Sequence, residues 1–260
     1  MTNKTYMIRR IICSDFFLIK NGYSQIDYND ADHALYERKC DIRFNNPIKS
    51  FNEWFGDAQK SIIEPNSMCL STCTKDGRSS SRFVLLKGID QETGLKFFTN
   101  YESWKGKQLA ENNQASAVFY WQPLHRSVRF EGRCIKLDAA QNAEYFLERC
   151  KGSQISAIIS KQSQPVKDRD TMENLCSQYE KEISASNKLL ECPSYWGGYA
   201  LQPDRIEFWQ GQTNRLHDRF LFLKVNNEMG ISREFEESDN FRELSNLTSD
   251  GQWRCQRLFP

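Results

Sequence analysis

The sequence has few of the residues on which metal-dependent and membrane-spanning proteins depend. It contains only three histidines, and its nine cysteines include no C-x-x-C pair, so we expect no metal site. No hydrophobic run reaches the length of a membrane span. The chain also has no G-x-G-x-x-G motif and no P-loop, which excludes Rossmann dinucleotide binding and Walker-type phosphate chemistry.

The charges are nearly balanced, with 35 Lys and Arg against 34 Asp and Glu. The formal net charge of +1 argues against nucleic acid or an anionic membrane as the main partner. Charged residues make up 27% and aromatic residues 13% of the chain, which is typical of a folded protein with aromatic-rich strands. The length of 260 residues alone allows one large domain or two small ones.

The cysteines and the N-terminal segment bear on the compartment. Scattered thiols indicate a reducing environment, so we expect a cytoplasmic protein. Residues 1–20 are basic, with Asp15 as their one acidic side chain, and Asp15 interrupts the apolar stretch IICSDFFLI. This segment makes a poor secretory signal and a weak mitochondrial presequence, and a mitochondrial location is the alternative.

Hydrophobic periodicity predicts the elements. Residues 1–45 show little periodicity and are predicted to be a mobile arm, whereas 46–260 form one domain. A helix is predicted to begin at Asn46-Pro47, because Pro is favoured at the first helical position and apolar residues follow at helical spacing. Further helices are predicted at 103–111, 139–149 (after the cap Asp138), 153–160 and 172–183.

Strands are predicted at 67–74, 79–88, 94–100, 115–121, 125–137 and 253–258, and in the segments GGYALQP, RIEFWQ and RFLFLKV. Closely spaced strands joined by turns suggest an antiparallel barrel rather than alternating βαβ units. The polar stretch 226–250 is predicted to be a surface insertion.

The segment EFWQGQTNRLHDR is the most informative part of the chain. If residues 215–219 are extended, Arg215, His217 and Arg219 share one face and Leu216 points the other way. Arginine suits bidentate recognition of phosphate or carboxylate, and histidine titrates near neutral pH. The pattern suggests a site for a phosphorylated, ring-shaped ligand; an exposed charged edge strand is the alternative.

Two further basic clusters can be read from the sequence. Arg82 and Lys87 bracket an apolar strand and suggest a ligand rim, although snorkelling cations would give the same pattern. Tyr145, Arg149 and Ser153 suggest a phosphate cradle near a helix start, with a surface Tyr–Arg pair as the alternative. Two anion cradles without a nucleophile motif suggest a phosphorylated cofactor and a phosphorylated substrate.

Several segments together resemble the pyridoxamine 5′-phosphate oxidase family: RFVLLKG, FFTNYESWKGKQL, FYWQPLHRSVRFEG, SQISAIISKQS, SYWGGY, EFWQGQTNRLHDR and the final RLFP. The resemblance runs from about Asn46 to Pro260. It implies an α+β fold, an antiparallel, Greek-key-like split β-barrel with peripheral helices, in a homodimer with FMN at the interface. The implied activity is oxidation of pyridoxamine or pyridoxine 5′-phosphate to pyridoxal 5′-phosphate, with O2 reduced to H2O2.

The resemblance also implies roles for individual residues. The FMN phosphate would be held by Arg82, Lys105 and Ser163, and the rest of FMN would be lined by Phe83, Val84, Leu85, Lys87, Phe98, Thr99, Gln162, Trp209 and Arg219. The substrate phosphate would be bound by Lys87, Tyr145, Arg149 and Ser153. Arg215, Leu216 and His217 would contact the substrate, with Arg215 and His217 orienting its ring and assisting proton movement.

Three positions depart from the family pattern. Trp104 precedes Lys105 where the family has Arg-Lys, Ser127 replaces a flavin-contacting Gln, and Gln25-x-x-Tyr28 keeps half of an R-x-x-Y motif. A lost charge-assisted phosphate contact costs about 1.5–3 kcal/mol, roughly ten- to a hundredfold in affinity. We therefore expect an active enzyme with weakened FMN affinity. The alternatives are a non-catalytic pyridoxal 5′-phosphate-binding paralogue and a different FMN split-barrel oxidoreductase, such as a flavin reductase.

Overall fold

One continuous antiparallel sheet of ten strands organises the part of the chain that the structure describes. The structure is a computed structural model that describes residues 42, 45–186, 189–213, 215–225 and 245–260, all within the unit Cys40–Pro260. The strands are β1 (Ser67–Cys73), β2 (Ser79–Leu85), β3 (Gly88–Asp90), β4 (Gly94–Asn100), β5 (Gln114–Trp121), β6 (Arg126–Lys136), β7 (Trp196–Gln210), β8 (Asp218–Lys224), β9 (Asn246–Leu247) and β10 (Trp253–Leu258). Their order is β2-β1-β5-β6-β7-β8-β10-β9, with β4 paired to β7 and β3 to β4.

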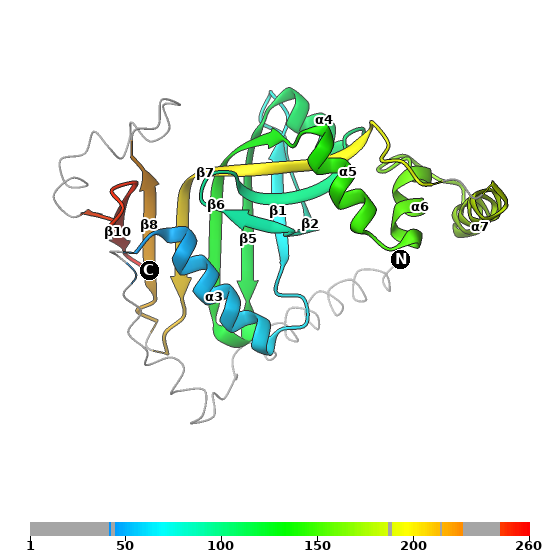
Figure 1. The fold of residues 1–260 in the computed structure, drawn as a ribbon. Coiled ribbons are helices and arrows are strands. Elements are labelled where there is room, and N and C mark those ends of the chain that lie inside the picture. Colours follow the sequence, from blue (N-terminus) through cyan, green and yellow to red (C-terminus); the bar gives the residue numbers. More distant parts are fainter. Residues whose placement is uncertain (1–41, 43–44, 187–188, 214, 226–244) are drawn as a thin grey trace, which may run out of the picture. The chain divides into compact units, whose positions relative to one another are not determined.

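The long strand β7 belongs to two parts of this sheet (Figure 1). Its residues 196–201 pair with β4, and its residues 205–210 pair with β8. In the part of the sheet that contains β4, the strands curl round until β2 contacts β4, and this closes the barrel. The register between β6 and β7 shifts at Gly132, where an added Cβ would lie 2.0 Å from the Gln202 carbonyl oxygen. Glycine is therefore required at this bulge, and bulges bend strands.

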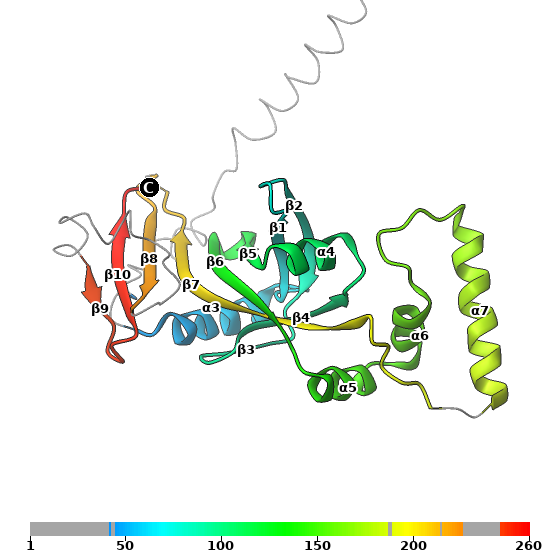
Figure 2. The same ribbon diagram turned by 90° about the horizontal axis from the view of Figure 1, so that it is seen from above.

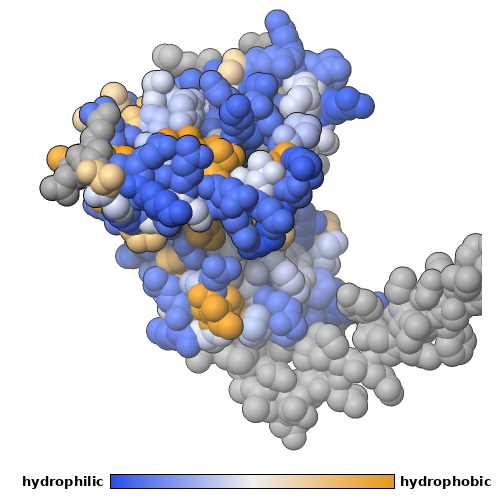
Figure 3. Space-filling view, turned by 90° about the vertical axis from the view of Figure 1, so that its right-hand side faces the viewer, coloured by the Kyte–Doolittle hydropathy of each residue, from blue (hydrophilic) through white to orange (hydrophobic). Residues whose placement is uncertain are grey.

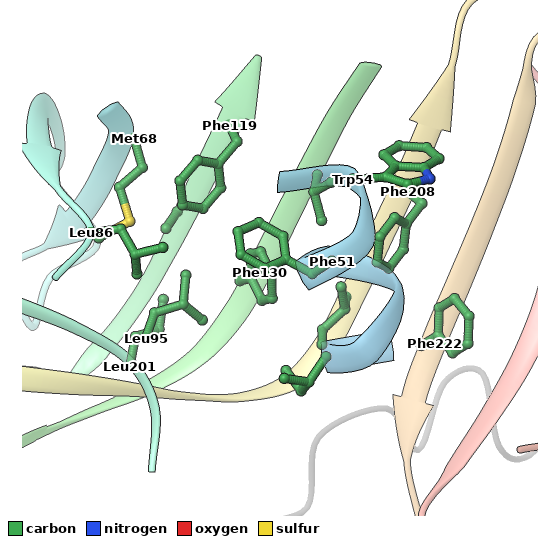
Figure 4. Packing of buried hydrophobic residues seen from close by; sticks show 14 of the residues in the cluster. Phe51, Trp54, Met68, Leu86, Leu95, Phe119, Phe130, Leu201, Phe208 and Phe222 are labelled. Carbon is green, nitrogen blue, oxygen red and sulfur yellow. The ribbon is translucent and has the colours of Figure 1, made fainter. Parts of the chain in front are cut away.

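Helix α3 (Pro47–Ser61) covers the barrel core. The Asn46 side chain caps it by accepting a hydrogen bond from the Ile48 backbone N–H at 2.8 Å. One face of the helix is apolar, and Phe51 packs edge-on against Phe130 with ring centroids 5.0 Å apart. Trp54 meets Phe208 of β7 in the same way, so α3 joins the barrel strands to the strand that leaves them (Figure 4).

The remaining helices are α4 (Trp104–Glu111), α5 (Ala139–Glu148), α6 (Lys151–Ile159) and α7 (Arg169–Ser186). A capping box between Asp138 and Gln141 starts α5, as the sequence predicts for Asp138. Helices α5, α6 and α7 lie together to one side of the barrel strands (Figure 2). They share a second hydrophobic cluster built around Phe146, Ile155 and Trp196. Seen from the side on which α6 and α7 lie, the surface is largely hydrophilic with separate small hydrophobic patches (Figure 3). None of the described helices is long and apolar enough to cross a membrane.

The sequence prediction fails in the loop before β8, and two other predicted segments lie mostly outside the described residues. Residues 215–217 are not strand: β8 begins at Asp218, and Arg215 has a left-handed backbone with φ 62°. Of the predicted insertion 226–250, residues 226–244 lie outside the described residues, but Thr248 is buried and β9 pairs with β10. The predicted arm 1–45 also lies outside the described residues, except for residues 42 and 45. Ile42 is buried in the barrel core.

Candidate active site

A cavity of about 530 Å³ lies between β2, β4 and the helices α4, α5 and α6. Its walls are Phe83, Val84, Leu85, Lys87, Phe98, Thr99, Lys105, Tyr145, Arg149, Cys150, Ser153, Gln162 and Trp196. The cavity therefore combines most residues predicted for the flavin with the whole set predicted for the substrate phosphate. We call it the first cavity.

A pair of cations marks one end of the first cavity. Lys105 lies in the first turn of α4, and its Nζ donates to Gln162 Oε1 at 2.8 Å and to Thr99 Oγ1 at 3.2 Å. Burial and the nearby charge of Arg82 lower the pKa of Lys105 to about 8. The side-chain acceptors of both cations are uncharged: Thr99 and Gln162 for Lys105, and Thr72 and Gln108 for Arg82. Two neighbouring cations of this kind favour a bound anion.

Arg82 is held from the side by uncharged groups. Its Nη1 donates to Thr72 Oγ1 at 2.6 Å, and its Nη2 donates to Gln108 Oε1 at 3.4 Å. Burial lowers the pKa of Arg82. Arg82 does not line the cavity but lies close enough to act on Lys105. Two cations, hydroxyl groups and the N-terminus of α4 are the groups that a phosphate requires, so the residues at this end fit the phosphate of FMN.

Trp104 and Ser163 close this end. The backbone N–H of Trp104 donates to Ser163 Oγ at 3.2 Å, so the predicted phosphate ligand Ser163 sits at the start of α4. Ser163 has a positive φ of 71°. The indole Nε1 of Trp104 donates to Ser80 Oγ on β2 at 3.2 Å, and the residue is 49% exposed. Trp104 thus links α4 to β2 by a hydrogen bond but adds no charge to the cation cluster.

The other end of the first cavity is aromatic and basic. Phe98 and Tyr145 stack with ring centroids 3.9 Å apart, and Trp196 stacks on Phe98 at 5.5 Å. The Arg149 guanidinium lies over the Trp196 ring at 4.8 Å, and the Lys87 Nζ lies 5.8 Å from the Tyr145 ring centre. Arg149 Nη1 is buried without a hydrogen-bond acceptor among the described residues. An anion at this point would satisfy it.

Sequence reasoning missed two residues of this cavity. Trp196 lies inside the segment SYWGGY. It lines the cavity because it stacks on Phe98, and the sequence does not show this contact. Cys150 precedes α6, and its Sγ lies 3.1 Å from Ser153 Oγ. The hydrogen bonds from Ser153 lower the pKa of this thiol, and the Arg149 charge adds to the effect. Its position in the sequence, between the predicted phosphate ligands Arg149 and Ser153, could have identified it as a cavity residue.

A second cavity of about 390 Å³ is lined by Tyr120, Ser127, Glu207, Trp209, Arg219 and Pro260. It contains Trp209 and Arg219, two of the four predicted flavin residues that do not line the first cavity; the other two are Arg82 and Ser163. Trp196 and Trp209 stand near opposite ends of β7, separated by about 40 Å of strand at ~3.3 Å per residue. One chain therefore holds the predicted flavin residues in two separate places.

The predicted catalytic residues lie in the loop beside the second cavity. His217 Nδ1 accepts a hydrogen bond from the Gln212 backbone N–H at 3.0 Å, and its ring lies 5.0 Å from the ring of Trp209. Arg215 and Leu216 are exposed. The predicted common strand face is wrong because the loop folds back on itself. His217 is fixed by a backbone bond and an aromatic contact instead.

Comparisons with known proteins agree with this geometry. Residues 55–178 match the family model "Pyridoxamine 5′-phosphate oxidase", and residues 196–260 match "Pyridoxine 5′-phosphate oxidase C-terminal dimerisation region". The chain is 49% identical over 217 residues to a pyridoxine-5′-phosphate oxidase of Bos taurus, covering 83% of this chain and 81% of that protein. It is 41% identical over 242 residues to a pyridoxine/pyridoxamine 5′-phosphate oxidase of Bombyx mori, covering 92% and 89%.

Solved structures show the same fold. The crystal structure of PhzG from Burkholderia lata, in complex with tetrahydrophenazine-1-carboxylic acid, matches with a TM-score of 0.68 at 26% identity, covering 86% of this chain and 96% of that one. A pyridoxamine 5′-phosphate oxidase-related, FMN binding protein from Nostoc punctiforme matches with a TM-score of 0.57 at 14% identity, covering 83% and 98%. The chain is thus an α+β split-barrel protein, as predicted. Within that class it belongs to the pyridoxine/pyridoxamine 5′-phosphate oxidase family.

Proposed function

We propose that the chain is an FMN-dependent oxidase that converts pyridoxamine or pyridoxine 5′-phosphate to pyridoxal 5′-phosphate and reduces O2 to H2O2. The observation that carries this proposal is the first cavity, which places two basic clusters at its two ends. One contains Lys105 beside Arg82, and the other contains Arg149 with Lys87. Two phosphate-bearing molecules, a cofactor and a substrate, would satisfy both clusters. The names of the similar proteins support the same reaction.

FMN would bind with its phosphate at Lys105, Arg82 and Ser163, because these residues supply two cations and a hydroxyl at a helix start. Its ring system would extend along the β2 residues 83–85 and the end of β4, where Phe98 and Thr99 line the same wall. The chemistry that FMN supplies when bound is to take two electrons from the substrate and pass them to O2.

The substrate phosphate would bind to Arg149, Lys87, Tyr145 and Ser153. The unpaired Nη1 of Arg149 gives this end of the cavity a buried donor in need of an acceptor. The stack of Phe98, Tyr145 and Trp196 fixes the wall that carries these groups. The substrate phosphate would thus be held at one end of the cavity, away from the flavin phosphate at the other.

A second copy of the chain would complete the site. The family match over residues 196–260, described as a dimerisation region, supports a homodimer. Phe83 is 76% exposed beside the first cavity, and Tyr120 is 59% exposed beside the second, so both cavities carry apolar rims that a partner could cover. In this arrangement FMN lies at the interface, between the first cavity of one chain and the second cavity of the other.

The partner subunit would also supply the groups that act on the substrate ring. His217 Nδ1 accepts the Gln212 N–H, so in the neutral imidazole the proton is on Nε2. His217 can therefore donate from Nε2 to an oxygen or nitrogen of the substrate. Arg215, exposed in the same loop, would orient the ring through its planar guanidinium.

We propose the cytoplasm as the compartment. All described cysteines are free thiols, which is typical of a reducing environment. Fractionation of cells that express the tagged chain would test this, and enrichment in mitochondria would contradict it.

Steady-state turnover tests the proposed activity. Purified protein supplied with FMN and pyridoxamine 5′-phosphate should form pyridoxal 5′-phosphate and H2O2 in equal amounts while O2 is consumed. Binding of pyridoxal 5′-phosphate without any turnover would contradict the proposal and indicate a carrier protein.

A further inference from the structure

Glu207 is a buried carboxylate on the wall of the second cavity, and arginines use both of its oxygens. It is 8% exposed. Its Oε1 accepts from Nε and Nη2 of Arg219 at 3.0 and 2.8 Å, and its Oε2 accepts from Nη2 of Arg129 at 2.7 Å. An arginine that donates two nitrogens to one carboxylate has its plane and direction fixed.

Arg219 is also held from a third side. Its Nη1 donates to the backbone carbonyl of Phe259 at 3.0 Å, so each of its side-chain nitrogens has an acceptor. A long arginine side chain normally keeps considerable rotamer freedom, and here that freedom is removed before any ligand binds. Buried ion pairs contribute little net stability, so we interpret this pair by its effect on the orientation of Arg219 rather than by its effect on folding.

The strand register places Glu207 and Arg219 beside one aromatic residue. Trp209 pairs directly with Arg219 across β7 and β8, and Glu207 precedes Trp209 by two residues on the same face of β7. All three residues line the second cavity. Glu207 therefore holds the arginine that is next to Trp209.

We propose that Glu207 is a positioning residue, which holds Arg219 beside Trp209 in the orientation that the flavin requires. The inference rests on the proposed function, in which Trp209 and Arg219 contact FMN. Glu207 itself would not touch the cofactor, because both of its oxygens already accept from arginines.

The test is a double-mutant cycle on FMN affinity, measured by quenching of flavin fluorescence when the full-length, FMN-free chain is titrated with FMN. Glu207→Gln should raise the Kd for FMN about tenfold, because the amide cannot hold Arg219 with a charge-assisted pair. Arg219→Gln should also raise the Kd. Adding Glu207→Gln to Arg219→Gln should change nothing further, because Glu207 acts through Arg219.

Two variants separate positioning from other roles. Glu131→Gln removes a carboxylate that pairs with Arg129 and Arg205 but does not touch Arg219, and it should leave the Kd within about twofold. Glu207→Asp keeps the charge but shortens the reach, so it should also raise the Kd. A wild-type Kd in Glu207→Asp, or additive effects in the cycle, would overturn the inference. The proposed function would still stand in that case, provided that the wild-type chain binds FMN. A wild-type chain that binds no FMN would overturn the proposed function and this inference together.

Discussion

The indole Nε1 of Trp104 donates a hydrogen bond to Ser80 Oγ at 3.2 Å, which straps the start of α4 to β2. The family resemblance leads us to expect an arginine at this position, and the tryptophan supplies this hydrogen bond in place of a cation next to Lys105. The backbone N–H of Trp104 still reaches Ser163, and the rest of the phosphate cluster is intact. Relative to that expectation, the cluster lacks one charge but keeps its geometry.

Restoring the arginine should tighten FMN binding. In Trp104→Arg the Kd for FMN should fall roughly ten- to a hundredfold, because a charge-assisted phosphate contact is worth about 1.5–3 kcal/mol. Trp104→Phe is the matched control, since it removes the indole N–H without adding charge, and it should leave the Kd near the wild-type value. An unchanged Kd in Trp104→Arg, measured by fluorescence titration, would show that the missing cation does not limit binding.

FMN affinity should depend on pH through Lys105. Its pKa is lowered from 10.5 to about 8 by burial and by Arg82, and a bound phosphate dianion would favour the protonated form. FMN affinity should thus be highest below pH 8 and fall as the pH rises through about 8. For folding without FMN the sign is opposite. The unfolded chain keeps this proton up to about pH 10.5, so Lys105 makes unfolding costlier as the pH rises from about 8 to 10.5.

Titrations between about pH 6.5 and 9.5 measure the first effect. Lys105→Arg is the control, because arginine stays charged throughout this range. The control should give a flatter profile than the wild type. Equal slopes for the two proteins would remove Lys105 from the phosphate site.

Cys150 should be the most reactive described thiol. It is exposed, and its pKa is lowered by hydrogen bonds from Ser153, whereas burial raises the pKa of Cys134 to about 12. Iodoacetamide near neutral pH should therefore alkylate Cys150 first and Cys134 last, as followed by peptide mass spectrometry. Because Cys150 lines the first cavity, pyridoxal 5′-phosphate should slow its alkylation. Equal rates with and without this ligand would place the phosphate elsewhere.

Hybrid dimers should show whether two chains share each site. Arg149→Gln damages the first cavity, and His217→Asn damages the loop beside the second, so each variant should be nearly inactive alone. In a mixed dimer, one site would combine both defects and the other would have neither. After random mixing, about a quarter of the wild-type activity should return.

Mixing two variants of the same cavity, Arg149→Gln and Lys87→Gln, is the control and should restore nothing. No recovery with Arg149→Gln and His217→Asn, despite proven subunit exchange, would place both groups in a site within one chain.

Sequence patterns predicted the elements well where burial follows a regular period. Helix α3 begins at Pro47 as predicted, because it packs one apolar face against the core. Strands β4 and β10 have the predicted bounds, because each forms part of a continuous ladder. The family motifs also named most residues of the first cavity. Local patterns are sufficient for these features because neighbouring residues determine them.

The loop before β8 shows where such reasoning fails. Alternating Arg215, Leu216 and His217 imitate a strand, but the Gln212 N–H captures His217 and the backbone at Arg215 turns left-handed. The sequence also could not show that the predicted flavin residues lie in two cavities, since motif order carries no information on the position of each strand. Trp196 and Trp209 are separated by the length of β7, which only the folded sheet reveals.

An absorbance spectrum of the FMN-loaded protein, before and after anaerobic addition of pyridoxamine 5′-phosphate, tests the proposed oxidase most directly. The flavin band should bleach when substrate is added and return when air is admitted, because the substrate's electrons pass through FMN to O2. A band that persists with saturating substrate, or a chain that takes up no FMN, would contradict the account.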